Sequence, residues 1–372
     1  MSQVVIENPI INSPFNEPTR HFRFSDEGIT NEIVEGRRTS AYFVPIARPK
    51  KKKGAKTPEL FETEWTEDRI EENKLVNDIR VRVAAWRKGG YFGVTPVTAR
   101  LLSYWTNPDR EKKLFFCQIE ALETAIYIAE VADKFGDAWI ANSIREANED
   151  ANPGLRRIAF KMATGAGKTV VMAMIIAWHT LNKMANPTDS RFSDTFLIVT
   201  PGITIRDRLR VLLPNDPENY YRQRDVVPAQ LKVQLTQAKI IITNYHAFHL
   251  RETVPAAKVT KSILSPDGVL SPFTETPLQM VRRVCRELGN KKNIVVINDE
   301  AHHCYRRKPN GEDETLAGDE RLEARQREEE ARVWISGIEA IKGKIGVRSI
   351  FDLSATPFFL RGSGYQEGTL FP

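Results

Sequence analysis

The stretch "RIAFKMATGAGKTVVMAM", residues 157–174, decides the fold class of this chain. An apolar run comes first, a glycine turn (Gly165-Ala166-Gly167) follows, and the remainder has helical periodicity. This order predicts a strand, a tight turn and a helix. Glycines let the backbone curl so that its N–H groups converge on an anion, and the helix directs its positive N-terminal end to the same point. The stretch therefore predicts a phosphate-binding loop.

The side chains of this loop fit a nucleotide. Lys168 would pair with the β- and γ-phosphates, and Thr169 would hold Mg²⁺ through its hydroxyl. One departure from the pattern G-x-x-x-x-G-K-[ST] is visible, since Met162 stands at the first glycine. An ordinary glycine turn before a helix is the alternative, which the flanking strand and helix disfavour. The residues expected to bind the nucleoside triphosphate in the loop are Thr164, Gly165, Ala166, Gly167, Lys168 and Thr169.

Apolar runs alternate with longer helical patterns after residue 109, which is typical of an α/β protein with a parallel sheet. Their centres are continuously apolar, as in strands that are buried on both faces. Each run ends in a polar or turn-forming cluster, and in open α/β sheets ligands bind beyond the carboxyl ends of the strands. The clusters are therefore expected to line one edge of one sheet. The runs are 156–162, 194–200, 238–244, 293–299 and 348–354.

The cluster "DEAHH" after the fourth run supplies acidic groups. Asp299 is placed to bind the Mg²⁺ ion, and Glu300 would orient or deprotonate the attacking water. Two acids at a strand end could instead cap a helix, but their position after a phosphate loop favours catalysis by Lys168, Asp299 and Glu300. His302, His303 and Cys304 are not expected to form a metal site, because adjacent positions cannot easily converge on one ion.

The rest of the chain predicts packing and solvation. Residues 1–110 are expected to form an accessory region and residues 111–372 the nucleotide-binding lobe. In the accessory region, residues 7–24 predict an extended arm lying on another surface. Residues 63–90 predict an amphipathic helix with acids in its first turn, and a second helix is expected to start at Thr95.

Two charged segments are interpreted as solvated. "RPKKKKGAK", residues 48–56, reads as a linker, with a nucleic-acid contact as the less favoured alternative. Residues 305–333 form a charged insertion whose second half predicts a helix, and a partner-binding arm is the alternative there.

Composition sets wider limits. The 372 residues are 41% hydrophobic and 27% charged, as in an ordinary globular protein. No apolar stretch is long enough to span a bilayer, and the N-terminal ten residues do not predict a signal peptide. Three widely separated cysteines argue against a disulfide framework and for a reducing cytoplasm. The net charge of +6 permits a polyanionic partner without requiring one.

The motifs "ATGAGKT", "DEAH" and "SAT", in that order, resemble motifs I, II and III of superfamily 2 helicases, in which the altered first glycine is common. "IVTPGITIRDRLRVLLP" resembles motif Ia and "IIITNYHAF" the next nucleic-acid contact motif; both are similar to the helicase subunit of type III restriction enzymes. "NEPTRHFRF" and "IVEGRRTSAYF" resemble large restriction-type helicases. The resemblance implies a RecA-like P-loop NTPase lobe, a parallel sheet flanked by helices, preceded by a small mixed, mostly helical N-terminal region.

The resemblance also implies site residues. Gln118 would read adenine, so that ATP is preferred; an exposed glutamine at a helix start is the alternative. His302, Ser354 and Thr356 would couple the ATP state to the nucleic-acid surface, and a Ser/Thr turn before Pro357 is the alternative for the last two. Sequence-independent contacts to the phosphate backbone, with strand-end capping and ion pairing as the alternative, would come from Pro201, Gly202, Thr204, Arg206, Thr243 and Asn244.

The function implied is the ATP-binding first lobe of an ATP-dependent DNA helicase or translocase from a type III-like restriction or phage-defence endonuclease. Duplex DNA and a methyltransferase or specificity subunit are the implied partners, and ATP with Mg²⁺ the cofactors. We expect an N-terminal fragment without the second motor lobe and its arginine finger, which contributes about 10³–10⁵ in rate. An RNA helicase lobe and a non-hydrolysing ATP-binding scaffold remain alternatives, the latter disfavoured by the intact Glu300.

Overall fold

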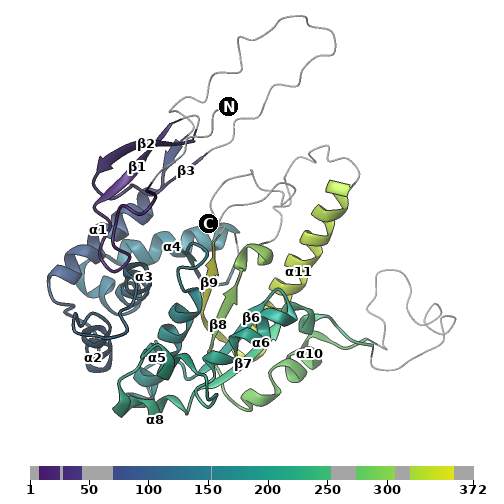
Figure 1. The fold of residues 1–372 in the computed structure, drawn as a ribbon. Coiled ribbons are helices and arrows are strands. Elements are labelled where there is room, and N and C mark those ends of the chain that lie inside the picture. The colour runs from purple at the N-terminus through teal and green to yellow at the C-terminus, as the bar shows by residue number, and fades with distance from the viewer. Residues whose placement is uncertain are drawn as a thin grey trace, which may run out of the picture.

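The computed structural model describes residues 8–25, 28–43, 70–151, 153–252, 274–305 and 319–355 (Figure 1). The strands are β1 (Arg20–Ser25), β2 (Gly28–Glu35), β3 (Ala41–Phe43), β4 (Ile70–Glu72), β5 (Arg157–Lys161), β6 (Thr195–Thr200), β7 (Lys239–Asn244), β8 (Ile294–Asp299) and β9 (Val347–Ser354). The α-helices are α1 (Lys74–Lys88), α2 (Pro96–Trp105), α3 (Phe116–Ile126), α4 (Ala138–Ala151), α5 (Lys168–Ala185), α6 (Ile203–Arg208), α7 (Tyr220–Gln223), α8 (Lys232–Leu235), α10 (Pro277–Val284) and α11 (Asp319–Ile345).

Shorter helical turns complete the chain. One is a π-helical turn, η2 (Tyr127–Val131). The others are 3₁₀ turns, namely η3 (Ala132–Phe135), η4 (Leu209–Leu212), η5 (Ala229–Leu231), η6 (Tyr245–Phe248), η7 (Arg286–Leu288) and η8 (Ala301–Cys304).

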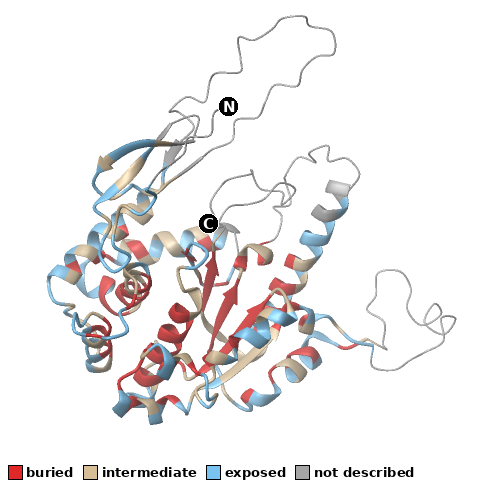
Figure 2. Ribbon diagram, viewed as in Figure 1, coloured by how far each residue is buried: buried red, intermediate tan, exposed pale blue. Residues whose placement is uncertain are grey.

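The central element is a five-stranded sheet in the order β5-β9-β8-β6-β7, and all of its strand pairs are parallel. Its strands coincide with the five apolar runs, so the predicted α/β class is confirmed. Strands β6 and β8 are buried at every position, as their continuous apolar sequence requires. Figure 2 shows the buried strands at the centre of the molecule. The carboxyl ends of all five strands therefore lie at one edge.

Helices cover both faces of this sheet. On one face α5 packs against Phe160, Phe196 and Phe351, together with residues of α1, α2 and α3. The other face is covered by α10 and α11, whose Trp334 and Ile338 pack against β6, β8 and β9. Helix α5 is buried continuously from Val170 to Asn182, because it lies between the sheet and the N-terminal helices. The phosphate loop therefore leads into the most enclosed helix of the fold.

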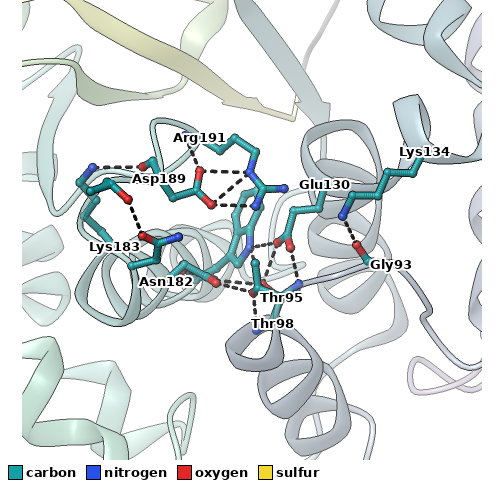
Figure 3. Close-up of polar contacts among 12 residues, drawn as sticks. Gly93, Thr95, Thr98, Glu130, Lys134, Asn182, Lys183, Asp189 and Arg191 are labelled. Carbon is teal, nitrogen blue, oxygen red and sulfur yellow. Dashed lines mark hydrogen bonds and ion pairs between the residues drawn. The ribbon is translucent and has the colours of Figure 1, made fainter.

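The N-terminal helices share this core through polar contacts as well (Figure 3). The carboxylate of Glu130 accepts hydrogen bonds from Thr98 Oγ1 at 2.7 Å and from Trp178 Nε1 at 2.8 Å. Asn182 Nδ2 donates to Thr98 Oγ1 at 2.9 Å. These buried bonds join α2 and η2 to α5. The boundary at residue 110 between accessory region and lobe stays a prediction, and α1 and α2 pack in the same core as the lobe.

The second half of the predicted extended arm is a paired strand. Residues 20–25 form β1, which pairs with β2 in an antiparallel hairpin. Local composition did not reveal this main-chain pairing with β2, the next segment along the chain. The first half does lie on another surface, since Phe116 N at the start of α3 donates to Pro14 O at 2.8 Å.

The predicted start of the first helix is wrong. Residues 70–72 form β4, which pairs with β3, and α1 begins at Lys74 after an Asn73 cap. Glu71 and Glu72 therefore lie in β4, before the helix, and the first turn of α1 holds no acid. The second helix follows the prediction, with Thr95 as its cap and Pro96 in its first turn.

Several predicted features lie outside the described residues, among them the linker at 48–56, Thr356 and residues 306–318 of the insertion. The helical second half of the insertion is present as α11, which continues past residue 333 to Ile345. Among the described helices, none combines the length and apolarity that crossing a membrane requires.

The core histidine His179 should make the protein sensitive to acid. Its ring lies 4.6–6.3 Å from four aromatic rings, and within the described residues neither ring nitrogen has a hydrogen-bond partner. Burial lowers the pKa of His179 to about 3. The unfolded chain therefore takes up a proton at His179 below about pH 6.5, whereas the folded chain does so only near pH 3. The free energy of unfolding should fall as the pH is lowered through this window, by about 2 kcal/mol between pH 7 and pH 5.

We expect His179→Phe to remove that loss, measured as the free energy of unfolding in urea at pH 7 and pH 5. The exposed Val233, changed to Thr, is the control and should leave the pH dependence as it is. An equal pH dependence of wild type and His179→Phe would contradict the prediction.

Candidate nucleotide-binding and hydrolysis site

The phosphate loop has the backbone conformation that its glycines predict. Gly165 and Gly167 have φ angles of +83° and +82°, and Gly167 caps α5, which begins at Lys168. Val170 N and Val171 N donate to Gly167 O, so the N–H groups that precede the first helical bonds, those of Lys168 and Thr169, can face an anion. Met162, at the position of the missing first glycine, is buried, and its N–H donates to Ser354 O at 2.9 Å. The altered position therefore serves packing and joins the loop to the end of β9.

Gln118 contacts the loop directly. Its Nε2 donates to Ala166 O at 2.9 Å, and its Oε1 accepts from Phe115 N at 3.0 Å. It is 5% exposed, so the alternative is wrong about exposure, but Gln118 does cap the start of α3 as a helix-start glutamine would. A Cβ on Gly167 would lie 2.2 Å from Gln118 Nε2, so a glycine is required for this approach as well as for its positive φ.

The catalytic candidates meet across the sheet. Lys168 Nζ, after β5, is 2.5 Å from Glu300 Oε1, after β8. Both side chains are largely shielded, with exposures of 14% and 29%, so the pair is screened less than a surface pair. Glu300 has a φ of +48°, in the left-handed region that non-glycine residues rarely adopt. Such strain occurs preferentially at functional sites.

Asp299 is a buried carboxylate, 8% exposed. Burial, reinforced by the negative charge of Glu300, raises the pKa of Asp299 to about 6. A divalent cation would favour its charged form and lower that pKa. With the hydroxyl of Thr169 in the first turn of α5, Asp299 gives the oxygen donor set that Mg²⁺ prefers, since Mg²⁺ is usually bound by one or two carboxylates with substrate phosphates. The residues present therefore fit a magnesium nucleotide.

His302 joins the acidic cluster to the end of β9. Its Nδ1 is hydrogen-bonded to Ser354 Oγ at 2.9 Å and lies 3.6 Å from Glu300 Oε2. Burial, with the nearby charge of His303, lowers the pKa of His302 to about 4, so its ring is neutral at pH 7. The two described coupling candidates, His302 and Ser354, are thus in contact. Among the described side chains, no group of three or more His, Cys, Asp or Glu residues is placed to hold a metal ion.

The predicted nucleic-acid contacts gather at the neighbouring strands. Pro201, Gly202, Thr204 and Arg206 follow β6, and Thr243 and Asn244 end β7; Thr200 is opposite Asn244 in the parallel register. Thr204 and Arg206 are exposed, whereas Asn244 is buried. Arg206 also pairs with Asp207 at 3.1 Å, which fits the alternative of ion pairing. These residues share an edge with the nucleotide site and form a second cluster there.

One side chain near the loop was not singled out by the sequence. Cys117 is exposed, and its Sγ lies 3.9 Å from Ala166 O, the carbonyl that Gln118 also contacts. Its place beside Gln118 at the start of α3 is the signal that could have identified it.

The two loop glycines allow a matched test of the Gln118 contact. Gly165→Ala meets nothing within 4 Å, so we expect it to cost stability only through its positive φ, by about 1–2 kcal/mol. Gly167→Ala carries the same strain and also displaces Gln118, so it should be less stable and bind MgATP more weakly than Gly165→Ala. Urea unfolding and equilibrium MgATP binding measure both effects, and equal results for the two variants would contradict the prediction.

Comparisons with known proteins agree with this arrangement. The family model for the type III restriction enzyme res subunit matches residues 111–359, most of the chain and all of the motif-bearing strands. Comparison with curated proteins and with solved structures found no match. The match confirms the helicase resemblance and the RecA-like P-loop NTPase class, and it makes this region a helicase-like ATPase domain. The chain belongs to the type III restriction enzyme res-subunit family.

Proposed function

We propose that this chain binds ATP with Mg²⁺ and hydrolyses the ATP as the first motor lobe of a duplex-DNA helicase or translocase in a type III-like restriction or phage-defence enzyme. The observation that carries the proposal is the contact between Lys168 and Glu300. The two side chains lie 132 positions apart in the sequence and meet at 2.5 Å beside Asp299.

Binding would start at the loop. The backbone N–H groups from Thr164 to Gly167 and the first turn of α5 would surround the phosphates, and Lys168 would exchange Glu300 for the β- and γ-phosphates. Gln118, already at the loop, would exchange its bonds with Ala166 O and Phe115 N for bonds to the adenine edge. A bound Mg²⁺ ion, held by Thr169 and Asp299, would offset the charge that develops on the phosphate oxygens.

Hydrolysis would use the carboxylate that the lysine releases. Freed from Lys168, Glu300 can accept a proton from a water whose oxygen attacks the γ-phosphorus while the bond to the β-phosphate oxygen breaks. The contact of His302 with Ser354 at 2.9 Å would carry a change at this acid to the end of β9. The edge formed by β6 and β7 would hold the nucleic-acid backbone through sequence-independent contacts.

Two alternatives concern the substrate and the role of ATP. An RNA helicase lobe would use the same core motifs, but the sequence "PGITIRD" favours the DNA enzyme. An ATP-binding scaffold would not need Glu300 in contact with the phosphate-loop lysine. A methyltransferase or specificity subunit is the proposed partner, and any endonuclease activity would reside in another domain.

Cys117 offers a direct measure of nucleotide binding. It is exposed beside the loop, whereas Cys285 and Cys304 are buried, so a thiol reagent added to the folded protein should label Cys117 first. MgATP should slow this labelling several-fold, because the nucleotide would occupy the space beside Ala166. Cys117→Ser should abolish the labelling. In Lys168→Ala, MgATP should no longer slow the labelling of Cys117. Equal labelling rates with and without millimolar MgATP would count against the proposed site.

Glu300→Gln separates binding from chemistry. It should keep or improve MgATP binding, since the charge that competes for Lys168 is removed, and should lower turnover about 10²–10⁴-fold, the usual contribution of a general base. The measurement is ATP hydrolysis with no nucleic acid, with duplex DNA and with RNA, beside Glu328→Gln on the exposed face of α11 as a control. Unchanged turnover in Glu300→Gln would refute the assigned base, and stimulation by RNA alone would favour the alternative substrate.

A further inference from the structure

A buried ion pair lies beneath the hydrolysis site and belongs to none of its motifs. Arg157 opens β5, and Asp352 lies in β9 two residues before Ser354. Arg157 Nε donates to Asp352 Oδ2 at 2.7 Å, and the two side chains are 2% and 1% exposed. A buried ion pair needs further hydrogen bonds to its charged groups, because otherwise the free energy lost by removing both charges from water would exceed their mutual attraction.

Two of those further contacts come from the end of η8, the turn that follows Glu300. Arg157 Nη2 donates to Cys304 Sγ at 2.8 Å, and the guanidinium lies 4.2 Å from the centroid of the Tyr305 ring. Tyr305 Oη in turn donates to Asp352 Oδ2 at 2.9 Å. Burial raises the pKa of Cys304 to about 12, so this sulfur is a neutral acceptor.

The residue two positions before Glu300 is tied to the same carboxylate. Asn298 Nδ2 donates to Asp352 Oδ1 at 2.7 Å, and Trp334 Nε1 from α11 donates to Asn298 Oδ1 at 3.0 Å. Asn148 fixes the other end of the pair, because its side chain accepts from Arg157 N and donates to Arg157 O. Asp352 is therefore bonded to chain on both sides of Glu300.

We infer that Arg157 and Asp352 are positioning residues for hydrolysis: they hold the chain before and after Glu300 so that its carboxylate stays opposite Lys168. The left-handed backbone of Glu300 supports this role, since such a conformation persists only where the surroundings determine it. Anchors at Asn298 and at Cys304–Tyr305 hold both ends of the eight-residue stretch 298–305 that contains Glu300. The inference rests on the proposed function of Glu300.

The pair can be tested without leaving an orphan charge. In the double variant Arg157→Met/Asp352→Asn both charges are removed and side-chain volume is nearly kept, which buried pairs tolerate better than loss of one partner. The matched control is Arg191→Met/Asp189→Asn, because Arg191 and Asp189 also pair at 2.7 Å but lie near the far end of α5 (Figure 3).

Two readouts distinguish positioning from general stability. The first is hydrogen exchange of the amides of residues 300–305, which should accelerate at least about tenfold while the amides of α5 keep their protection. The second is the division between MgATP affinity, followed by Cys117 protection, and kcat. We expect affinity to stay within a few-fold and kcat to fall by up to about 10²-fold, the effect of misplacing a catalytic group by about 1 Å. The control pair should change neither.

Unchanged exchange at 300–305, or unchanged kcat in the folded double variant, would overturn the inference. If the double variant does not fold, Tyr305→Phe, which removes one hydroxyl, should still accelerate exchange at 300–305, and no acceleration would overturn the inference. If wild-type turnover does not exceed that of Glu300→Gln, the proposed function fails, and the exchange result alone decides whether the pair positions this segment.

Discussion

The parallel direction of five buried strands is the constraint on which the rest of this structure depends. Parallel neighbours cannot be joined by tight hairpins, so each connection crosses a face of the sheet and covers it, as α5, α10 and α11 do. Both faces are then buried, and the strands must be apolar almost throughout. The same constraint brings every carboxyl end to one edge. Residues more than a hundred positions apart, such as Lys168 and Glu300, can meet there without any local sequence relation.

Polar groups inside this fold follow two different patterns. Glu130, Asn182 and the Arg157–Asp352 pair are buried with hydrogen bonds, which limits the cost of removing them from water. His179 and Asp299 are buried with fewer hydrogen bonds to offset the loss of hydration. Burial lowers the pKa of His179 and raises the pKa of Asp299, so the neutral form of each is favoured. For His179 the consequence is acid sensitivity of the core. For Asp299 the consequence is chemical, because a cation would stabilise the charged form of a carboxylate whose pKa burial has raised.

Most residues of the candidate site could be predicted from the sequence, but few of the buried contacts that hold them in place could. The five strands, the glycine turn and the acids after β8 each carry a local signal, a run of apolar residues followed by a distinctive cluster. The β1–β2 hairpin was missed because its prolines and weak periodicity gave no strand signal. The start of α1 at Lys74 was missed because pairing of β4 with the distant β3 overrode the local pattern. The contacts of Arg157 with Asp352, Cys304 and Tyr305 were also missed, since a charged residue in a strand-like run normally predicts an exposed position.

Apolar periodicity and glycine positions act over a few neighbouring residues, so the fold class, the order of the motifs and the residue types available for chemistry can be predicted from the amino-acid sequence. Which of those residues touch depends on the three-dimensional arrangement. The pairing of Lys168 with Glu300, the contact of Gln118 with the loop and the left-handed backbone of Glu300 all depend on how strands far apart in the chain are ordered in the sheet. That order is set by packing of helices on two faces and by buried hydrogen bonds, neither of which any short stretch of sequence contains.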